Sequence, residues 1–144
     1  MVGFDEIMVP VDGSEGSHRA ARFGGQLAAG LQLPLKLAYV VPLTREGVMA
    51  FAKMTKEEVE TFEHQQARSV LDKVVAAIGD TGADMSEVVL IGDPAEEILN
   101  YSAKHPKALL VMGRRGLSPI KSLMLGSVSE KVMRYAQGAV TVVN

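Results

Sequence analysis

The sequence predicts one doubly wound, Rossmann-like α/β domain over residues 1–144, with a five-stranded parallel sheet (order 3-2-1-4-5) and helices on both faces. Five short apolar runs alternate with amphipathic or capped segments, and this alternation favours a parallel sheet covered on both sides. The length of 144 residues and the 47% hydrophobic content match one domain with a substantial core. No linker, repeat or low-complexity tract divides the chain. Right-handed crossovers then leave few topologies.

The first predicted strand is the apolar run 7–11, and a helix follows it. Ser14 is placed to cap that helix. Its apolar positions recur at helical spacing, namely Ala20, Phe23, Leu27 and Leu31. The second strand covers 33–41, between two prolines. Residues 43–54 are expected to be irregular.

A long amphipathic helix is predicted from about Thr55. Its apolar face carries Val59, Phe62, Val70, Val74 and Ile78, and its other face carries Lys56, Glu57, Glu60 and Glu63. This pattern is typical of a solvated helix that covers a sheet.

The third strand is predicted at 85–92, and a second helix start follows it directly. Asp93 serves as cap, Pro94 takes the first helical position, and Glu96 completes a capping pattern. The buried face of this helix is expected to hold Ile98, Leu99, Tyr101 and Ala103. The fourth strand covers 108–112.

The last helix is predicted to begin at a capping box formed by residues 127–130 and to run through Ala136. Gly138 fits its C-terminal stop. The fifth strand covers 139–143, where β-branched residues dominate.

Composition excludes several classes of protein. Fifteen basic residues against 17 acidic ones give a net charge of -2, which argues against a nucleic-acid binder. The absence of cysteine excludes disulfides, a thiol nucleophile and zinc-thiolate sites. No apolar run approaches the length of a membrane span, and the opening residues are acidic where a signal peptide would be basic. We therefore expect a cytoplasmic protein without membrane insertion.

Two strand ends carry the residues that favour ligand binding. In doubly wound sheets, ligands bind beyond the carboxyl ends of the strands, where the winding reverses. Residues 10–14 follow the first strand, and the glycine-rich segment 113–129 follows the fourth. Gly126 and Ser127 open a helix whose first N–H groups lack internal partners and so attract phosphate. The alternative is that the glycines only make turns and Ser127 only caps its helix.

The same segment is locally basic. Between residues 113 and 129 stand Arg114, Arg115 and Lys121, with no acid among them. Ser127 and Ser129 add hydroxyl donors. A cradle for an anionic ligand is the functional interpretation.

The spacing within this segment resembles a known family. Gly113 and Gly116, nine residues, then Gly126-Ser127 match G-x2-G-x9-G-[ST], the nucleotide-binding pattern of the universal stress protein family. The opening IMVPVDGS, the helix start GSVSEKV and the terminal VTVVN also resemble that family, over essentially the whole chain. The resemblance implies the ATP-binding group of the family and a stress-response regulator that holds ATP, ADP or AMP.

Carried over by position, the resemblance implies a role for each site residue. Asp12 would hold the ribose, and the backbone near Val40 would contact the adenine edge. The nucleotide site as a whole would comprise Pro10, Val11, Asp12, Val40, Met112, Gly113, Arg115, Gly116, Gly126, Ser127, Val128 and Ser129, of which Gly116 and 126–129 would cradle the phosphates. Arg114 and Arg115 depart from the small and imidazole residues often found there in the family.

Other functions fit the sequence less well. Residues 116–122 lack the second glycine of a P-loop, and neither a dinucleotide fingerprint nor a nucleophile elbow occurs. His18, His64 and His105 show no metal-ligand spacing and are expected at the surface, and no metal site is predicted. A phosphoacceptor receiver domain would need paired acids after the first strand, where only Asp12 stands.

Two alternatives within the same fold remain open. One is a protein-contact module without nucleotide; the other is a slow ATPase, with no catalytic residue assigned. Asp12 or a phosphate oxygen could hold Mg²⁺ beside ATP, although no second carboxylate supports a dedicated site. An unknown regulatory protein is the expected downstream partner.

The fifth strand also predicts an assembly. In the order 3-2-1-4-5 it lies at a sheet edge, and an edge strand without Pro or Lys invites pairing with another chain. The resemblance implies a homodimer centred on residues 140–143.

Overall fold

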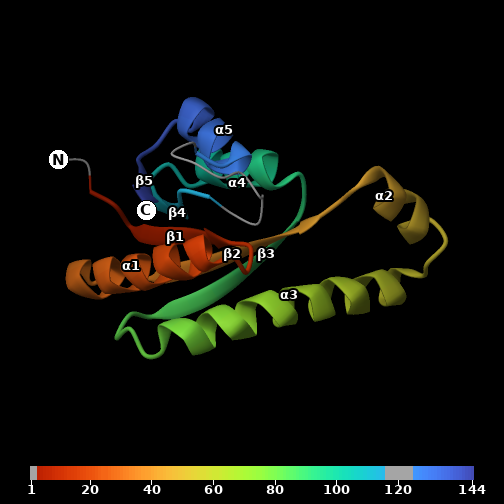
Figure 1. Ribbon diagram of the computed structural model, residues 1–144, viewed down its shortest axis with the longest axis horizontal. Coiled ribbons are helices and arrows are strands. Elements are labelled where there is room, and N and C mark those ends of the chain that lie inside the picture. Colours follow the sequence, from red (N-terminus) through yellow and green to blue (C-terminus); the bar gives the residue numbers. More distant parts are fainter. Residues whose placement is uncertain (1–2, 116–124) are drawn as a thin grey trace.

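The computed structural model describes residues 3–115 and 125–144 and shows a three-layer α/β domain (Figure 1). The central sheet has the order β3-β2-β1-β4-β5, and all of its pairings are parallel. The predicted strand order is therefore confirmed. The strands are β1 (Glu6–Val11), β2 (Leu35–Pro42), β3 (Met85–Gly92), β4 (Ala108–Gly113) and β5 (Val140–Val143).

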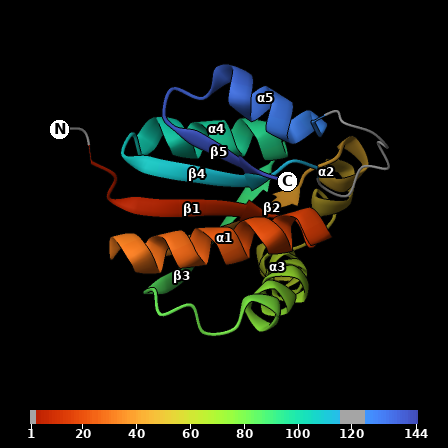
Figure 2. The ribbon, with the colours of Figure 1, turned by 60° about the vertical axis from the view of Figure 1, so that its left-hand side comes forward.

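Helices cover both faces of the sheet, as Figure 2 shows. The helices are α1 (Glu15–Leu31), α2 (Arg45–Phe51), α3 (Lys56–Ile78), α4 (Pro94–Lys104) and α5 (Ser127–Tyr135). α1 and α3 pack on one face, and α4 and α5 pack on the other. Alternate residues of each strand therefore serve two separate cores.

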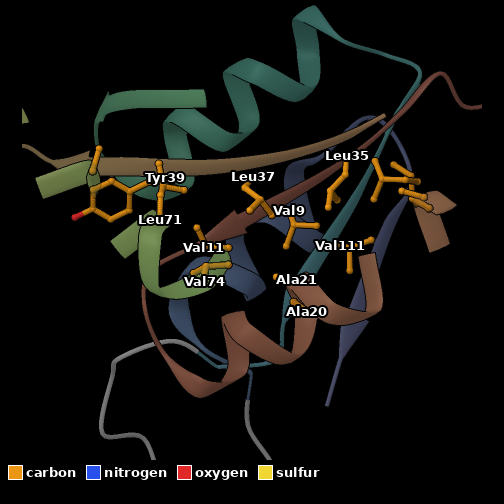
Figure 3. Packing of buried hydrophobic residues seen from close by; sticks show 14 of the residues in the cluster. Val9, Val11, Ala20, Ala21, Leu35, Leu37, Tyr39, Leu71, Val74 and Val111 are labelled. Carbon is orange, nitrogen blue, oxygen red and sulfur yellow. The ribbon is translucent and has the colours of Figure 1, made fainter. Parts of the chain in front are cut away.

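The larger core lies between the sheet and the α1 and α3 helices (Figure 3). Alternate residues of β1 and β2 point into it, together with Leu71 and Val74 from α3. The smaller core joins Met8 and Leu110 from the sheet to Ile98 of α4 and Val132 of α5. Burial on both faces explains why the central strands are apolar runs rather than alternating patterns.

The buried face of α1 differs from the predicted one. Phe23 and Leu31 are 41% and 50% exposed, whereas Ala20, Ala21, Gly24, Gly25 and Ala28 are buried. The reason is the closeness of α1 to β1: a Cβ on Gly24 would lie 2.5 Å from Cγ2 of Val9. Only small residues fit at this contact, so the largest apolar residues of the helix mark its periphery.

The other helix faces agree with the predictions in part. In α3, Val74 is buried and Val70 and Ile78 pack at the margin of the core, but Phe62 is 38% exposed. In α4, Ala103 is exposed and its neighbour Ser102 is buried.

The prediction that residues 43–54 are irregular is wrong, because they contain α2. Thr44 caps this helix by accepting a hydrogen bond from the Gly47 amide at 3.0 Å. None of its residues is buried, so its sequence has no amphipathic pattern from which the helix could be predicted. Local capping, rather than core packing, defines this helix.

Several ends also differ from the predicted bounds. β2 runs from Leu35 through Pro42, β4 extends to Gly113, and β5 begins at Val140. α5 ends at Tyr135, with Ala136 as an extended C-cap, so Gly138 does not terminate it. β3 keeps its predicted bounds and its predicted place at the sheet edge, where Val89 and Ile91 are exposed.

The histidines lie in three different settings. His64 is exposed, and His105 is half-buried and stacks on Tyr101 with ring centroids 3.9 Å apart. His18 is half-buried, and its Nε2 atom is enclosed without a hydrogen-bond partner among the described residues, so it is not a plain surface side chain. No helix within residues 3–115 or 125–144 is long and apolar enough to cross a membrane.

Candidate functional site

A cavity of about 290 Å³ opens at the carboxyl ends of β1, β2 and β4, beside the starts of α4 and α5. This is the position where doubly wound sheets bind ligands. Every predicted site residue lines it except Gly116, which lies outside the described residues. The lining residues are Pro10, Val11, Asp12, Ser14, Ser17, Ala38, Tyr39, Val40, Pro42, Pro94, Ile98, Met112, Gly113, Arg115, Gly126, Ser127, Val128 and Ser129.

The wall after β1 is a hydrogen-bonded turn that starts α1. Oδ1 of Asp12 accepts hydrogen bonds from the Ser14 amide at 2.9 Å and from the Ser14 hydroxyl at 2.5 Å. Ser14 in turn caps α1 by accepting from the Ser17 amide at 3.1 Å, as predicted. Asp12 therefore shapes the turn, and this role does not itself exclude a contact with a ribose, since a carboxylate accepts at two oxygens.

The wall after β4 is built around the start of α5. The Gly126 amide donates to the Arg114 carbonyl at 2.8 Å, which ties this start to the end of β4. The Gly126 carbonyl accepts the first helical hydrogen bond, from the Glu130 amide at 2.9 Å. Gly126, not Ser127, is thus the N-cap, and no side chain of residues 3–115 or 125–144 caps the helix.

This start contradicts the prediction that residues 127–130 form a capping box with Ser127 as the cap. It also counts against the alternative in which Ser127 only caps its helix. The other four helices have side-chain caps, from Ser14, Thr44, Thr55 and Asp93. Among the helices of the described residues, only α5, whose first residues line the cavity, begins without one. Its first N–H groups and the positive end of its dipole are suited to an anion.

The Ser129 hydroxyl makes a hydrogen bond within the protein. Its hydroxyl is buried and donates to the Gly113 carbonyl at 2.7 Å. A hydroxyl has a single proton to donate, so that proton is not directed at a ligand. The hydroxyl instead holds α5 against β4.

Gly113 has a structural reason for lacking a side chain. A Cβ at this position would lie 2.6 Å from the Gly16 carbonyl oxygen and 3.2 Å from the Ser17 amide. A Cβ on Gly16 would in turn lie 2.3 Å from the Arg115 carbonyl oxygen. The sequence suggested close approach to a ligand; here glycine allows α1 to approach the end of β4.

Sequence reasoning found Val40 and Met112 of the cavity's apolar floor but missed Ala38 and Ile98. Ala38 and Val40 of β2 lie on the same face of the sheet as Met112, and Ile98 of α4 faces them. The alternation of side chains along β2 could have identified Ala38 once Val40 was chosen. Pro94 was recognised as a helix start, but its place at the cavity depends on the strand order.

Tyr39, Ser14, Ser17 and Pro42 also line the cavity without having been predicted as site residues. Tyr39 points to the opposite face of β2 from Ala38 and Val40. Burial raises the pKa of its phenol, and the nearby charge of Asp12 raises it further. The phenol therefore remains protonated and neutral around pH 7.

The cavity thus has two chemically different parts. One is apolar, from β2, α4 and Met112, and the other carries hydroxyls, the Asp12 carboxylate, Arg115 and the start of α5. Such a combination suits a ligand with a flat apolar part and an anionic part. Within the described residues, no group of three His, Asp or Glu side chains is arranged to hold a metal ion.

Known proteins resemble this chain along its length. The model of the Universal stress protein family matches residues 3–144. Universal stress protein YxiE of Bacillus subtilis is 29% identical over 149 residues, which cover 97% of this chain and 99% of the relative. The structure of universal stress protein UspA from Lactobacillus plantarum aligns over 100% of both chains with a TM-score of 0.80 and 22% identity. The structure of a universal stress protein in complex with cAMP aligns over 99% of this chain and 98% of that one, with a TM-score of 0.74 and 25% identity.

Proposed function

The chain belongs to the universal stress protein family, and from that premise we propose that it is a cytoplasmic, adenine-nucleotide-binding regulator of the stress response. The observation that supports the proposal is the start of α5: it has no side-chain cap from the described part of the chain, and residues 126–129 line the cavity. An anion is the natural partner of such a helix start. The related protein in complex with cAMP supports an adenine nucleotide as the ligand.

The two parts of the cavity fit the two parts of a nucleotide. The apolar floor, with Val40 and Met112, would take the adenine, and Asp12 would accept from the ribose hydroxyls. The backbone amides of Ser127, Val128 and Ser129 would meet the phosphates, and the Ser127 hydroxyl would add a donor. Gly116, outside the described residues, completes this set by the family pattern.

Calorimetric titration with ATP, ADP, AMP and cAMP, with GTP as comparison, tests this proposal. Gly126→Val should abolish binding, because a side chain would intrude where backbone must meet phosphate. The backbone of Gly126 has φ of -65° and ψ of 157°, which valine adopts readily, so the variant is expected to fold. Gly3→Val is the matched control, since nothing lies within 4 Å of its Cβ position.

Two results would overturn the assignment. A wild-type protein that binds none of the adenine nucleotides, and carries none when purified, would favour a protein-contact module. Unchanged affinity in folded Gly126→Val would mean that the phosphates do not bind at the start of α5.

ATP, where bound, is proposed to signal by occupancy rather than by turnover. Asp12 is the only acid among the described residues that line the cavity, and its Oδ1 holds the turn before α1. No general base is thus supported, and Mg²⁺ would accompany the phosphates instead of occupying its own site. Phosphate release measured over several hours should stay close to the protein-free rate; rapid release would make the protein an ATPase.

We also propose a homodimer through β5. The Leu110 amide donates to Ala139 and the Arg114 amide to Val143, so alternate residues of β5 face β4. Val140 and Val142 then direct their backbone groups to the open edge. Val142→Pro would remove an outward donor while the β4–β5 ladder stays intact, and should give a monomer by light scattering. Val142→Thr, which keeps the N–H, should remain dimeric; a wild-type mass near 15.4 kDa would refute the dimer.

A further inference from the structure

The edge of the sheet opposite β5 is a long strand that the fold leaves uncovered. β3 has eight residues and pairs only with β2 along a continuous register. It contains no proline and no lysine, and Glu87 is its only charged residue. Such an edge lacks the common protections against pairing with another chain.

The hydrogen bonds identify which backbone groups face outward. The Leu35 amide donates to the Asp84 carbonyl at 2.8 Å, and the Leu43 amide donates to Gly92 at 3.2 Å. Because successive residues of a strand alternate sides, the even-numbered residues between them face β2. Glu87, Val89 and Ile91 therefore direct their backbone N–H and C=O groups to the open edge.

The same three residues direct their side chains to the α3 face of the sheet. Their registered neighbours Leu37, Tyr39 and Val41 belong to the core on that face. α3 covers those neighbours, but Val89 and Ile91 remain 44% and 39% exposed. An added strand would thus find both hydrogen-bonding groups and apolar side chains at this edge.

A hollow of about 480 Å³ lies between α3 and this edge, and it is acidic. It is lined by Glu60, Glu63, His64, Ala67 and Arg68 of α3 and by Glu87 and Val89 of β3. The single guanidinium among them, that of Arg68, donates to Asp72 at 2.8 Å and to Glu87. Three carboxylates and one guanidinium line the hollow, and the guanidinium is paired with Glu87, so the remaining negative charge of Glu60 and Glu63 favours a basic side chain.

The opposite face of the edge has a different character. Val88 and Leu90 are half-buried and pack against the smaller core on the α4 side. Side chains of an added strand would alternate between these two faces. The matching segment therefore alternates lysine or arginine, toward the hollow, with apolar residues toward Val88 and Leu90.

We propose that β3 is a docking edge for an extended, alternating basic and apolar segment of a partner protein, which adds as a sixth strand. A second copy of β3 is a poorer occupant, because it would bring Glu87 and the acids of α3 against the same acids. The proposal does not depend on the nucleotide cavity, which lies at the carboxyl ends of β1, β2 and β4 and is lined by no residue of β3, or on the dimer through β5.

The test uses a fluorescein-labelled, end-capped peptide of four Val-Lys repeats and measures its anisotropy with the full-length protein. We expect a dissociation constant of about 100 µM or tighter, and much weaker binding of the corresponding Val-Glu peptide. Val89→Pro removes an outward N–H but no bond to β2, and should weaken binding about tenfold. Val89→Thr keeps the N–H and the strand propensity, and should bind within about twofold of wild type.

A charge reversal with a matched control distinguishes the effect of the acidic residues in the hollow from the effect of the protein's overall negative charge. Glu60→Lys with Glu63→Lys should weaken the Val-Lys peptide about tenfold, because both carboxylates line the hollow. Glu57→Lys with Glu58→Lys makes the same change in net charge on exposed α3 residues outside it, and should weaken binding about threefold or less. If Val89→Pro fails to fold by circular dichroism, this pair of variants decides the question.

Three outcomes would overturn the proposal. The first is no binding of the Val-Lys peptide at about millimolar protein. The second is equal weakening by the two charge reversals, which would reduce the effect to net charge. The third is a wild-type oligomer by light scattering that Val89→Pro dissociates, which would make a second copy of the chain the occupant of this edge.

Discussion

The two ends of the parallel sheet carry polar groups of different kinds. At the amino end, Glu6 is only 6% exposed; it accepts from the Tyr101 hydroxyl at 2.9 Å and pairs with Lys36 at 2.7 Å. At the carboxyl end, an open cavity is lined by apolar side chains, by Asp12 and Arg115, and by the start of α5, which no described side chain caps. At the amino end, polar side chains bind one another. At the carboxyl end, polar groups line an open cavity.

This difference separates structure from binding. A buried carboxylate with a phenol and an ammonium as partners stabilises the contact between α4 and the sheet, and offers little to a ligand. A helix start without a side-chain cap leaves backbone donors that water or an anion must satisfy. Polar residue types alone would have favoured the amino end, with its Glu, Lys, Tyr and His105, as the site.

The largest loss of stability is expected at the carboxyl end of the sheet, where the backbone of Gly113 lies against that of Gly16. Gly113→Ala would put a Cβ 2.6 Å from the Gly16 carbonyl oxygen, and neither backbone segment can move cheaply. We expect a loss of about 2–3 kcal/mol of unfolding free energy by urea titration, at the upper end for overpacked sites. Nucleotide binding should fall with it, because the start of α1 would shift.

The matched control is Gly138→Ala, near the amino end. Its Cβ would meet its nearest neighbour at 3.8 Å, an ordinary contact, so stability should change by only about 0.5 kcal/mol. Equal losses in the two variants would mean that close packing does not distinguish the two ends.

The next largest effect concerns the role of Asp12 in binding. Asp12→Ala should weaken adenosine nucleotides by about 1.5–3 kcal/mol, the value of a hydrogen bond to a charged group. It should also loosen the turn that Ser14 completes, since Oδ1 accepts from that residue twice.

Asp12→Asn separates these two roles, because the amide keeps an oxygen acceptor but loses the charge. Its stability should match wild type, while its calorimetric affinity falls as in Asp12→Ala. If ribo- and 2′-deoxyribonucleotides lose equal affinity in both variants, Asp12 makes no specific contact with the 2′-hydroxyl.

The fold could be predicted from the sequence because its signals are local and redundant. The strand positions follow from apolar runs between turn residues, and Ser14, Thr55 and Asp93 mark helix starts that the structure contains. α2 escaped prediction because none of its residues is buried. The face of α1 was misassigned because close packing selects alanine and glycine, which hydrophobicity patterns undervalue.

The sequence located those cavity residues that belong to the two loops after β1 and β4, but not most of the others. Residues 10–12 and 126–129 adjoin recognisable turns at strand ends, so the spacing of the motif located them. Ala38, Tyr39 and Ile98 join the cavity only through the strand order and the packing of α4, which are long-range properties. The capping error at Gly126 arose because Ser127 resembles a cap in sequence, while only backbone geometry shows where the helix begins.

A smaller effect is expected from the amino end. Tyr101→Phe removes the hydroxyl that donates to Glu6 and leaves that buried carboxylate with Lys36. We expect a loss of about 1–2 kcal/mol by urea titration. Nucleotide affinity should stay within about twofold of wild type, because Tyr101 does not line the cavity and the substitution keeps the ring that packs in the same core as Ile98. A larger change in affinity would show that α4 couples the two ends, and the separation argued above would fail.

The smallest effect is a loss of stability at alkaline pH that has a contribution from each end. At the amino end, the hydrogen bond with Glu6 raises the pKa of Lys36, and burial followed by the same carboxylate raises the pKa of Tyr101. At the carboxyl end, burial and the charge of Asp12 raise the pKa of Tyr39. Above about pH 10 the unfolded chain loses these protons while the folded chain keeps them, so stability must fall as pH rises.

Urea titrations at pH 8 to 11 can divide this loss between the two ends. Wild type should hold its stability up to about pH 10 and lose it progressively above that value. The double variant Lys36→Met with Tyr101→Phe should remove the part of the alkaline stability loss that comes from the amino end. Tyr39→Phe should remove the part that comes from the carboxyl end. In each case stability should fall less steeply with pH. A decline that Tyr39→Phe leaves unchanged would mean that the phenol beside the cavity titrates normally, and that the charge of Asp12 does not reach it.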